Sequence, residues 1–199
     1  MSADLERRFV GGECRMDPTD GSRIRGMAVV FDSLSENLGG FKEIIKPEAV
    51  DRTLREALDV RALADHDTGK VLGRTKSGTL QLRKEKRGLA IALDADPEIS
   101  YAKDVMRAVS RGDISGMSFG FRVLEDDWRE DPETGFPVRE VLDMRIAEVS
   151  IVAFPAYAAT DVQVSQRSLD SLREFQIARR YSNRSVAHLQ RVHKARLAR

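Results

Sequence analysis

Cysteine is nearly absent from this chain of 199 residues, and long apolar runs are missing. Cys14 is the single cysteine, which excludes an intrachain disulfide and a cysteine-rich zinc site. No run approaches the roughly 20 apolar residues that a membrane-spanning helix needs, and the first eight residues lack the apolar stretch of a signal peptide. We therefore expect a cytoplasmic protein, outside the membrane, whose stability comes from packing.

Charge is balanced in total but unevenly distributed. The formal net charge is +1, yet from Gln166 onward nine basic residues face only two acidic ones. Apolar residues recur there at helical spacing, which predicts a basic amphipathic helical tail over residues 165–199, acting as a propeptide or targeting segment. The tail has few aromatic residues, so stacking on nucleic acid is not favoured, although a salt-dependent contact stays open. Residues 1–24 are expected to be flexible and residues 25–164 to form the core domain.

Within the core domain some segments have apolar residues at the spacing of a strand and others at the spacing of a helix. Pro47 predicts the start of a helix, and Gly112 predicts the end of another over residues 101–109. The segments 80–82 and 89–93 alternate on either side of a charged turn and predict a hairpin. Further strands are expected at residues 27–31, 60–66, 117–123, 138–142 and 146–153. This pattern indicates an α+β fold, a curled sheet of short strands with two or three helices.

Residues 116–120 match the pattern G-x-S-x-G around Ser118, which in α/β-hydrolases marks the nucleophile. That motif needs a sharp strand-to-helix turn, whereas the alternation from Met117 to Val123 predicts a strand that continues through the serine. Two histidines follow Ser118, but both lie in the basic tail, so the hydrolase order of serine, acid and histidine also fails. Alone, the motif favours a serine flanked by two glycines in a strand.

His66 is the only histidine of the predicted core, at the end of a strand. A histidine between two aspartates is commonly a surface turn residue, but a neutral imidazole is also what a serine nucleophile requires as base. Glu148 interrupts an apolar strand, so it either faces solvent or orients the imidazole. Asp65 and Asp67 flank His66, yet three adjacent residues of a strand cannot all point to one metal ion, and no metal site is expected.

Three groups of motifs occur in order: ADHD with VLGR over residues 64–74, ISGMSFGF over residues 114–121, and EVSIV with PAY over residues 148–157. Together they resemble the prohead proteases of tailed bacteriophages, serine peptidases distantly similar to the herpesvirus assemblins. The likeness spans about residues 25–160. It implies that Ser118 is the nucleophile, His66 the general base and Glu148 the residue that holds the imidazole. Ser115, three residues before Ser118, is the alternative nucleophile.

The resemblance also implies a fold and a biological role. The fold would be a small, closed or nearly closed, mainly antiparallel β-barrel surrounded by helices. The enzyme would cleave scaffold segments and capsid-protein extensions inside the assembling prohead, in the host bacterial cytoplasm, and would trim its own terminus. No cofactor is implied. The oligomeric state stays open, a homo-oligomer included, and the oxyanion-hole donors are sought among the backbone N–H groups near Gly116 or Gly73 and Arg74.

A second hypothesis comes from another class of protein. The chain could be a catalytically silent capsid assembly or scaffold protein that keeps a protease-like fold and docks through its tail. The presence of Ser118, His66 and Glu148 together argues against this alternative.

Overall fold

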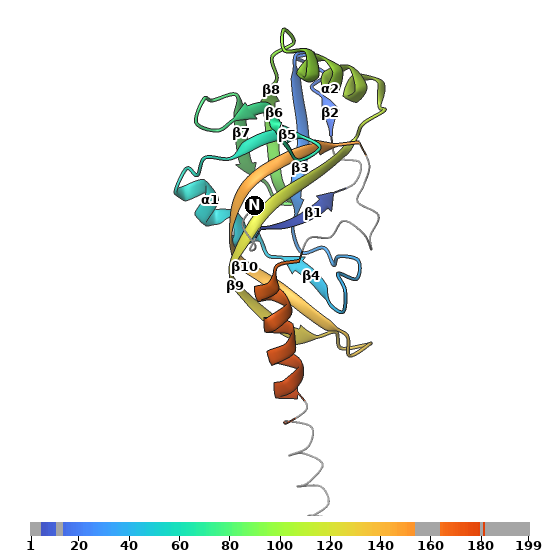
Figure 1. Cartoon of the computed structure of the whole chain (residues 1–199), viewed down its shortest axis with the longest axis vertical. Helices are drawn as coiled ribbons and strands as arrows, with labels where there is room; N and C mark the ends of the chain where they lie inside the picture. Colours follow the sequence, from blue (N-terminus) through green and yellow to red (C-terminus); the bar gives the residue numbers. More distant parts are fainter. Residues whose placement is uncertain (1–4, 11–13, 154–163, 180, 182–199) are drawn as a thin grey trace, which may run out of the picture.

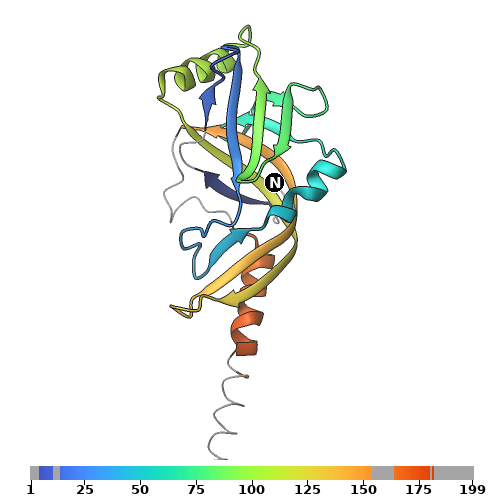
Figure 2. The same cartoon turned by 180° about the vertical axis from the view of Figure 1, so that it is seen from behind.

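The computed structural model describes residues 5–10, 14–153, 164–179 and 181, and two β-sheets make up most of it (Figures 1 and 2). The first sheet has the strand order β1-β9-β10-β5-β6, with β4 also paired to β10. Its strands are β1 Glu6–Val10, β4 Lys42–Ile45, β5 Arg61–Ala64, β6 Asp67–Arg74, β9 Gly116–Glu130 and β10 Pro137–Val152. The second sheet has the order β2-β3-β8-β7, formed by β2 Arg15–Met16, β3 Arg23–Val30, β7 Leu80–Lys84 and β8 Gly88–Asp94.

Strands β9 and β10 form one long hairpin that curves through the whole molecule in Figure 1. Strand β10 joins the two shorter strands that the sequence predicted, because bulges near Val141 and Ile146 let the pairing with β9 continue. Strands β4 and β5 lie parallel to β10, whereas the other pairs are antiparallel. The hairpin is therefore the frame on which the other strands of its sheet assemble.

The expected α+β class is confirmed, but over the described residues the sheets do not close into a barrel. The first sheet ends at β1 on one side and at β6 on the other, and these strands are not paired with each other. In the described part of the chain helices do not surround the sheets: helix α2 (Ser100–Arg111) lies at one end and the helix of residues 166–179 at the other (Figure 1). Two open sheets packed together bury the apolar strand faces without closure.

Several local predictions are confirmed by the structure. The β7–β8 hairpin pairs Leu80 with Leu93 and Leu82 with Ile91. Helix α2 ends at Gly112, whose φ of 78° is the left-handed cap conformation that glycine adopts without strain. Pro47 opens the 3₁₀ helix η1 (Pro47–Val50), which runs into helix α1 (Asp51–Arg55).

The expectation of a flexible segment over residues 1–24 is corrected for its described residues. Strand β1 pairs with β9 over five residues, from Glu6 opposite Phe121 to Val10 opposite Met117. Cys14 is buried in the core as well. This polar segment is ordered because its charged side chains have buried partners of opposite charge.

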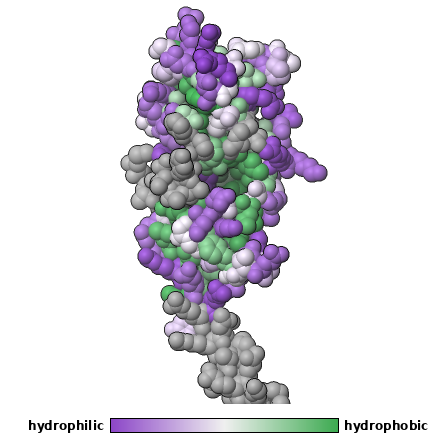
Figure 3. Space-filling model, turned by 90° about the vertical axis from the view of Figure 1, so that its right-hand side faces the viewer, coloured by the Kyte–Doolittle hydropathy of each residue, from purple (hydrophilic) through white to green (hydrophobic). Residues whose placement is uncertain are grey.

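The main core lies between the two sheets and takes one face of the long hairpin. Met117, Phe119 and Phe121 of β9 are buried there beside Val149 and Ile151 of β10. The rings of Phe119 and Phe121 stack with centroids 4.9 Å apart. Figure 3 shows that one side of the molecule carries apolar side chains around its middle, between hydrophilic ends. Among the described helices, none is long and apolar enough to cross a membrane.

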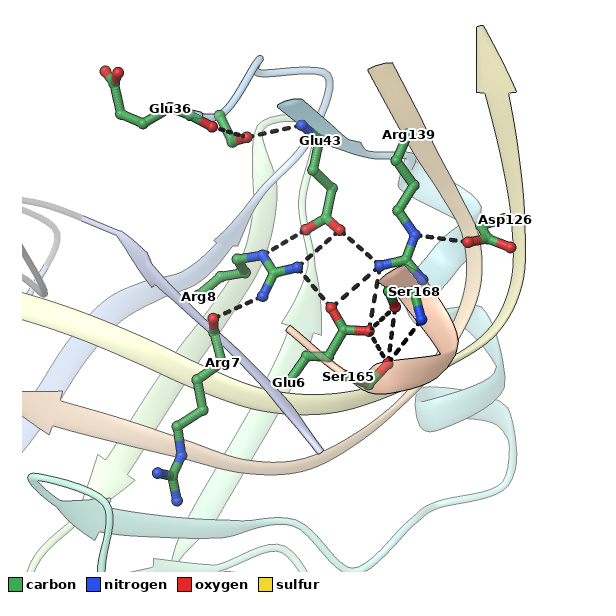
Figure 4. A network of polar contacts seen from close by, with 10 residues as sticks. Glu6, Arg7, Arg8, Glu36, Glu43, Asp126, Arg139, Ser165 and Ser168 are labelled. Carbon is green, nitrogen blue, oxygen red and sulfur yellow. Dashed lines mark hydrogen bonds and ion pairs between the residues drawn. The ribbon is translucent and has the colours of Figure 1, made fainter. Parts of the chain in front are cut away.

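Five charged side chains meet in the interior where β1, β4, β9 and β10 come together (Figure 4). Arg8 donates to Glu43 at 2.8 Å and to Glu6 at 2.7 Å. Arg139 lies 3.2 Å from Glu6 and 3.1 Å from Glu43, and it donates to Asp126 at 2.7 Å. The side chains of Arg139 and Glu6 are each 1% exposed, so the charges depend on one another for compensation. We call this set the ionic network.

The helix of residues 166–179 is joined to the ionic network at its first turn. The hydroxyls of Ser165 and Ser168 donate to Glu6 Oε1 at 3.0 Å and 2.5 Å. Arg167 donates to the carbonyl of Val123 at 2.8 Å, and Leu172 is buried against Phe41. The first part of the predicted basic tail is therefore helical and packed on the sheet, whereas residues 182–199 lie outside the described residues.

We expect Arg139→Ala to lower the free energy of unfolding by about 3–5 kcal/mol, because loss of one partner leaves buried charge uncompensated. Urea unfolding followed by circular dichroism measures this change. Arg129→Ala is the matched control: it lies on the same hairpin, is 43% exposed and pairs with Glu140. An exposed pair of this kind contributes about 0–1 kcal/mol. Equal losses for the two variants would contradict the structural role of the ionic network.

The pKa of Glu6 makes this stabilisation depend on pH. Burial alone raises that pKa, but Arg139, Arg8 and the Ser168 hydroxyl outweigh burial and hold it below its ordinary value of 4.5. A carboxyl whose pKa falls on folding stabilises the protein above its unfolded pKa, and this stabilisation is lost as the pH falls through the folded pKa. We expect the difference in unfolding free energy between wild type and Glu6→Gln to be largest above pH 4.5 and to shrink below it. Urea unfolding at a series of pH values checks this, and a constant difference would contradict it.

Candidate active site

Strand alternation places a second set of side chains on the face of the long hairpin that is turned away from the main core. In the β9–β10 register, Ser118 lies opposite Ser150 and Gly120 lies opposite Glu148. Residues opposite each other in an antiparallel pair share one face, so these four positions are neighbours. Ser118, Ser150 and Glu148 are all buried. We call this set, together with His66, the polar face.

His66 and Glu148 are in direct contact. The Nδ1 atom of His66 lies 2.6 Å from Oε1 of Glu148, although the two residues are 82 positions apart. A carboxylate accepts hydrogen bonds and does not donate them, so the ring nitrogen is the donor. Of the two alternatives for Glu148, the structure shows the buried and partnered one, with its side chain 8% exposed.

A strained turn positions His66. The sequence placed this residue on a strand, but it lies with Asp65 in the two-residue connection between β5 and β6, where φ is 46° for Asp65 and 59° for His66. Two consecutive positive φ values are typical of a type I′ hairpin turn. Asp65 also fixes the turn to the end of β10: its N–H donates to the carbonyl of Ile151 at 3.0 Å, and its carboxylate accepts the N–H of Ala153 at 2.9 Å. This anchorage holds the imidazole over the hairpin.

Ser118 lies on the same face but is not hydrogen-bonded to His66 in the described part of the chain. Its hydroxyl donates to the carbonyl oxygen of Arg8 in β1 at 2.9 Å. The structure thus brings His66 and Glu148 together and leaves the Ser118 hydroxyl directed to the neighbouring strand.

The two glycines of the G-x-S-x-G match have a packing role. A Cβ at Gly116 would lie 2.6 Å from a ring carbon of Phe9, and a Cβ at Gly120 would lie 2.6 Å from Oε1 of Glu148. Side chains at these positions would displace the Phe9 ring or the carboxylate. The motif therefore makes room on both sides of Ser118, and β9 continues through it as the alternation predicted.

Comparison with known proteins identifies the family of this chain. The family described as caudovirus prohead serine protease matches residues 13–175, which is most of the chain. The chain belongs to this family.

A relative within the curated proteins is the prohead protease of Enterobacteria phage HK97, which is 27% identical over 150 residues. The match covers 74% of this chain and 63% of that relative, so the chain spans less than two thirds of its length. No solved structure is significantly similar to the chain. The family match includes residues 165–175, in which the helix of residues 166–179 packs on the ionic network.

Two further residues of this prohead protease family member touch Glu148, and sequence reasoning missed both. Ser150 donates to Glu148 Oε2 at 2.6 Å, and Nε of Arg7 lies 3.6 Å from Oε1. The hydroxyl of Ser150 within an otherwise apolar strand could have indicated a buried contact, because buried polar groups need hydrogen-bond partners. Nothing local could have placed Arg7 there, since β1 reaches the site only through its pairing with β9.

Other candidates from the sequence lie elsewhere. Ser115 is exposed and precedes β9. The N–H of Arg74, considered for the oxyanion hole, donates to the hydroxyl of Thr79 at 2.9 Å. Burial raises the pKa of the Cys14 thiol to about 12, so this cysteine is protonated at neutral pH and is a poor nucleophile. Within the described ranges, no group of three or more His, Cys, Asp or Glu residues could hold a metal ion.

We expect Gly120→Ala to break the contact between His66 and Glu148, because the added methyl would lie 2.6 Å from the carboxylate oxygen. Overpacking of this kind also costs about 1–3 kcal/mol of stability. Proton NMR of the His66 ring N–H measures the contact, since a short bond to a carboxylate moves this resonance downfield. Gly21→Ala is the matched control, because nothing lies within 4 Å of a Cβ at that position. An unchanged His66 resonance in Gly120→Ala would contradict the role given to Gly120.

Proposed function

We propose that this chain is a serine endopeptidase of phage capsid maturation, with Ser118 as nucleophile, His66 as general base and Glu148 as the residue that holds the imidazole. The observation that carries the proposal is the 2.6 Å contact between His66 Nδ1 and Glu148 Oε1, on the hairpin face that also bears Ser118. Membership of the prohead serine protease family supports the same class of reaction.

The contact defines what each nitrogen of His66 does in this proposal. Because the Nδ1–H group donates a hydrogen bond to Glu148, the neutral ring has its lone pair on Nε2, and Nε2 accepts the proton of the nucleophile. The negative charge of Glu148 then stabilises the imidazolium that forms. Burial of the carboxylate strengthens this interaction, because fewer water molecules screen it.

The Ser118 hydroxyl first leaves the Arg8 carbonyl, which requires rotation about one side-chain bond. Hydrogen bonds of this type commonly tighten only when substrate is bound. The Ser118 oxygen then attacks a peptide carbonyl while His66 takes its proton, and His66 returns that proton to the departing amine. Water, activated by His66, hydrolyses the acyl-enzyme and restores Ser118. Only side chains of this protein take part, and no cofactor enters these steps.

The proposed substrates are scaffold segments and extensions of the major capsid protein, cleaved inside the assembling prohead in the host bacterium, together with a terminus of the chain itself. The relative from phage HK97, named a prohead protease, supports this setting, as does the family match. The proposed targeting or propeptide role of the basic tail, and any contact with nucleic acid through it, concern mainly residues 182–199, outside the described residues.

A catalytically silent assembly protein is the second candidate, and one observation favours it. The Ser118 hydroxyl is bonded to the backbone of β1 and not to His66, which is the arrangement expected of a serine that only joins two strands. The same fold without the reaction would still dock on capsid proteins.

Intact mass spectrometry separates these two functions. We expect the wild-type chain, co-expressed with the capsid and scaffold proteins of the same phage, to yield shortened capsid protein. Ser118→Ala should yield none, because loss of the nucleophile in a serine protease lowers kcat by roughly a millionfold.

Ser115→Ala is the matched control, since Ser115 is exposed, lies outside β9 and is the alternative nucleophile. It should behave as the wild type. Identical products from wild type and Ser118→Ala would support the silent assembly protein, and loss of cleavage in Ser115→Ala alone would move the nucleophile to that residue.

A further inference from the structure

The carboxylate of Glu148 is held from two sides. Its Oε1 accepts from His66 Nδ1 at 2.6 Å, and its Oε2 accepts from the hydroxyl of Ser150 at 2.6 Å. Ser150 is 1% exposed and lies two positions after Glu148 on the same face of β10. Each oxygen of the carboxylate therefore has one short hydrogen bond from a protein donor.

The Ser150 contact matters because a glutamate side chain is poorly fixed at its end. The last torsion of glutamate is broad, so the carboxylate plane turns easily unless both oxygens are bonded. Glu148 also has a competing partner, since Nε of Arg7 lies 3.6 Å from the same oxygen that His66 uses. Among the described residues this buried nitrogen has no hydrogen-bond partner, so a carboxylate that turned toward it would gain a charged bond.

We propose that Ser150 is the positioning residue that keeps the Glu148 carboxylate hydrogen-bonded to His66 and not to Arg7. The hydroxyl of Ser150 is bonded to Oε2 of Glu148, so it acts through Glu148. The inference rests on the proposed function, because its effect on reactivity requires that His66 activates Ser118.

Ser150→Ala, made in the full chain, tests the proposal. A fluorophosphonate probe reports the reactivity of the nucleophile without knowledge of the cleavage site. We expect the limiting rate of labelling at saturating probe to fall about tenfold to about a hundredfold, as when a residue that orients a catalytic group is removed. The probe concentration at half saturation should stay within about twofold, because Ser150 is buried and its hydroxyl is bonded to Glu148.

Two further variants distinguish loss of the Ser150 hydrogen bond from a general loss of stability. Ser150→Thr keeps the hydroxyl and should restore most of the labelling rate, whereas Ser150→Cys has nearly the same volume but only a weak donor and should remain slow. The downfield His66 ring N–H resonance should weaken or move upfield in the Ala and Cys variants and return in the Thr variant. A merely structural role of Ser150 would leave this resonance in place.

Ser168→Ala is the matched control elsewhere in the molecule. Ser168 is also a buried serine that donates to a glutamate, Glu6, but it belongs to the ionic network. It should lower the unfolding temperature and leave both the labelling rate and the His66 resonance at wild-type values.

The possible outcomes separate the two proposals. Labelling of Ser150→Ala at the wild-type rate, while Ser118→Ala is not labelled, would overturn the role of Ser150 and leave the proposed function intact. Labelling of Ser118→Ala at the wild-type rate would overturn the proposed function itself. A slow Ser150→Ala whose His66 resonance is unchanged would also overturn the positioning role.

Discussion

The ionic network is the interaction on which the rest of this structure depends. Through two guanidinium groups and three carboxylates it joins β1, β4 and the β9–β10 hairpin, and the Ser168 hydroxyl connects it to the helix of residues 166–179. Buried charges are costly unless each is compensated, so the geometry of these elements is closely specified. Because Arg8 is fixed on the inner face of β1, alternation directs its neighbours Arg7 and Phe9 to the polar face. The network thus fixes β1, the strand whose Arg8 carbonyl oxygen accepts the hydrogen bond of the Ser118 hydroxyl.

The long hairpin serves two purposes with its two faces. Its inner face contributes Met117, Phe119 and Phe121 to the core, and its outer face carries Ser118 and Glu148. A side chain on a strand that is packed from behind has few ways to move, so the polar residues are held on a rigid support. The one irregular element is the turn at Asp65 and His66, whose backbone strain is offset by its bonds to the end of β10.

Predictions that depend on neighbouring residues agree with the structure. Contacts between residues far apart in the sequence were not predicted from local patterns. The β7–β8 hairpin and the Gly112 cap depend on neighbouring residues, and alternation predicted the strand that continues through Ser118. The contact of His66 with Glu148 was expected only from the family resemblance, because no rule about neighbouring residues joins two residues 82 positions apart. The ionic network was not predicted, because the sequence does not distinguish its charged residues from residues at the surface. The closed barrel was not found, because pairing at sheet edges is decided by tertiary packing.

The contact between Glu6 and Ser168 also has a consequence for the order of events during synthesis. These residues are 162 positions apart, so the ribosome must release nearly the whole domain before the contact can close. Contacts of such long sequence separation form late and slowly in folding. Strand β1, which provides the Arg8 carbonyl beside Ser118, reaches its final anchorage only then. In a nascent chain the backbone around Ser118 therefore lacks this anchorage until the helix of residues 166–179 has been made.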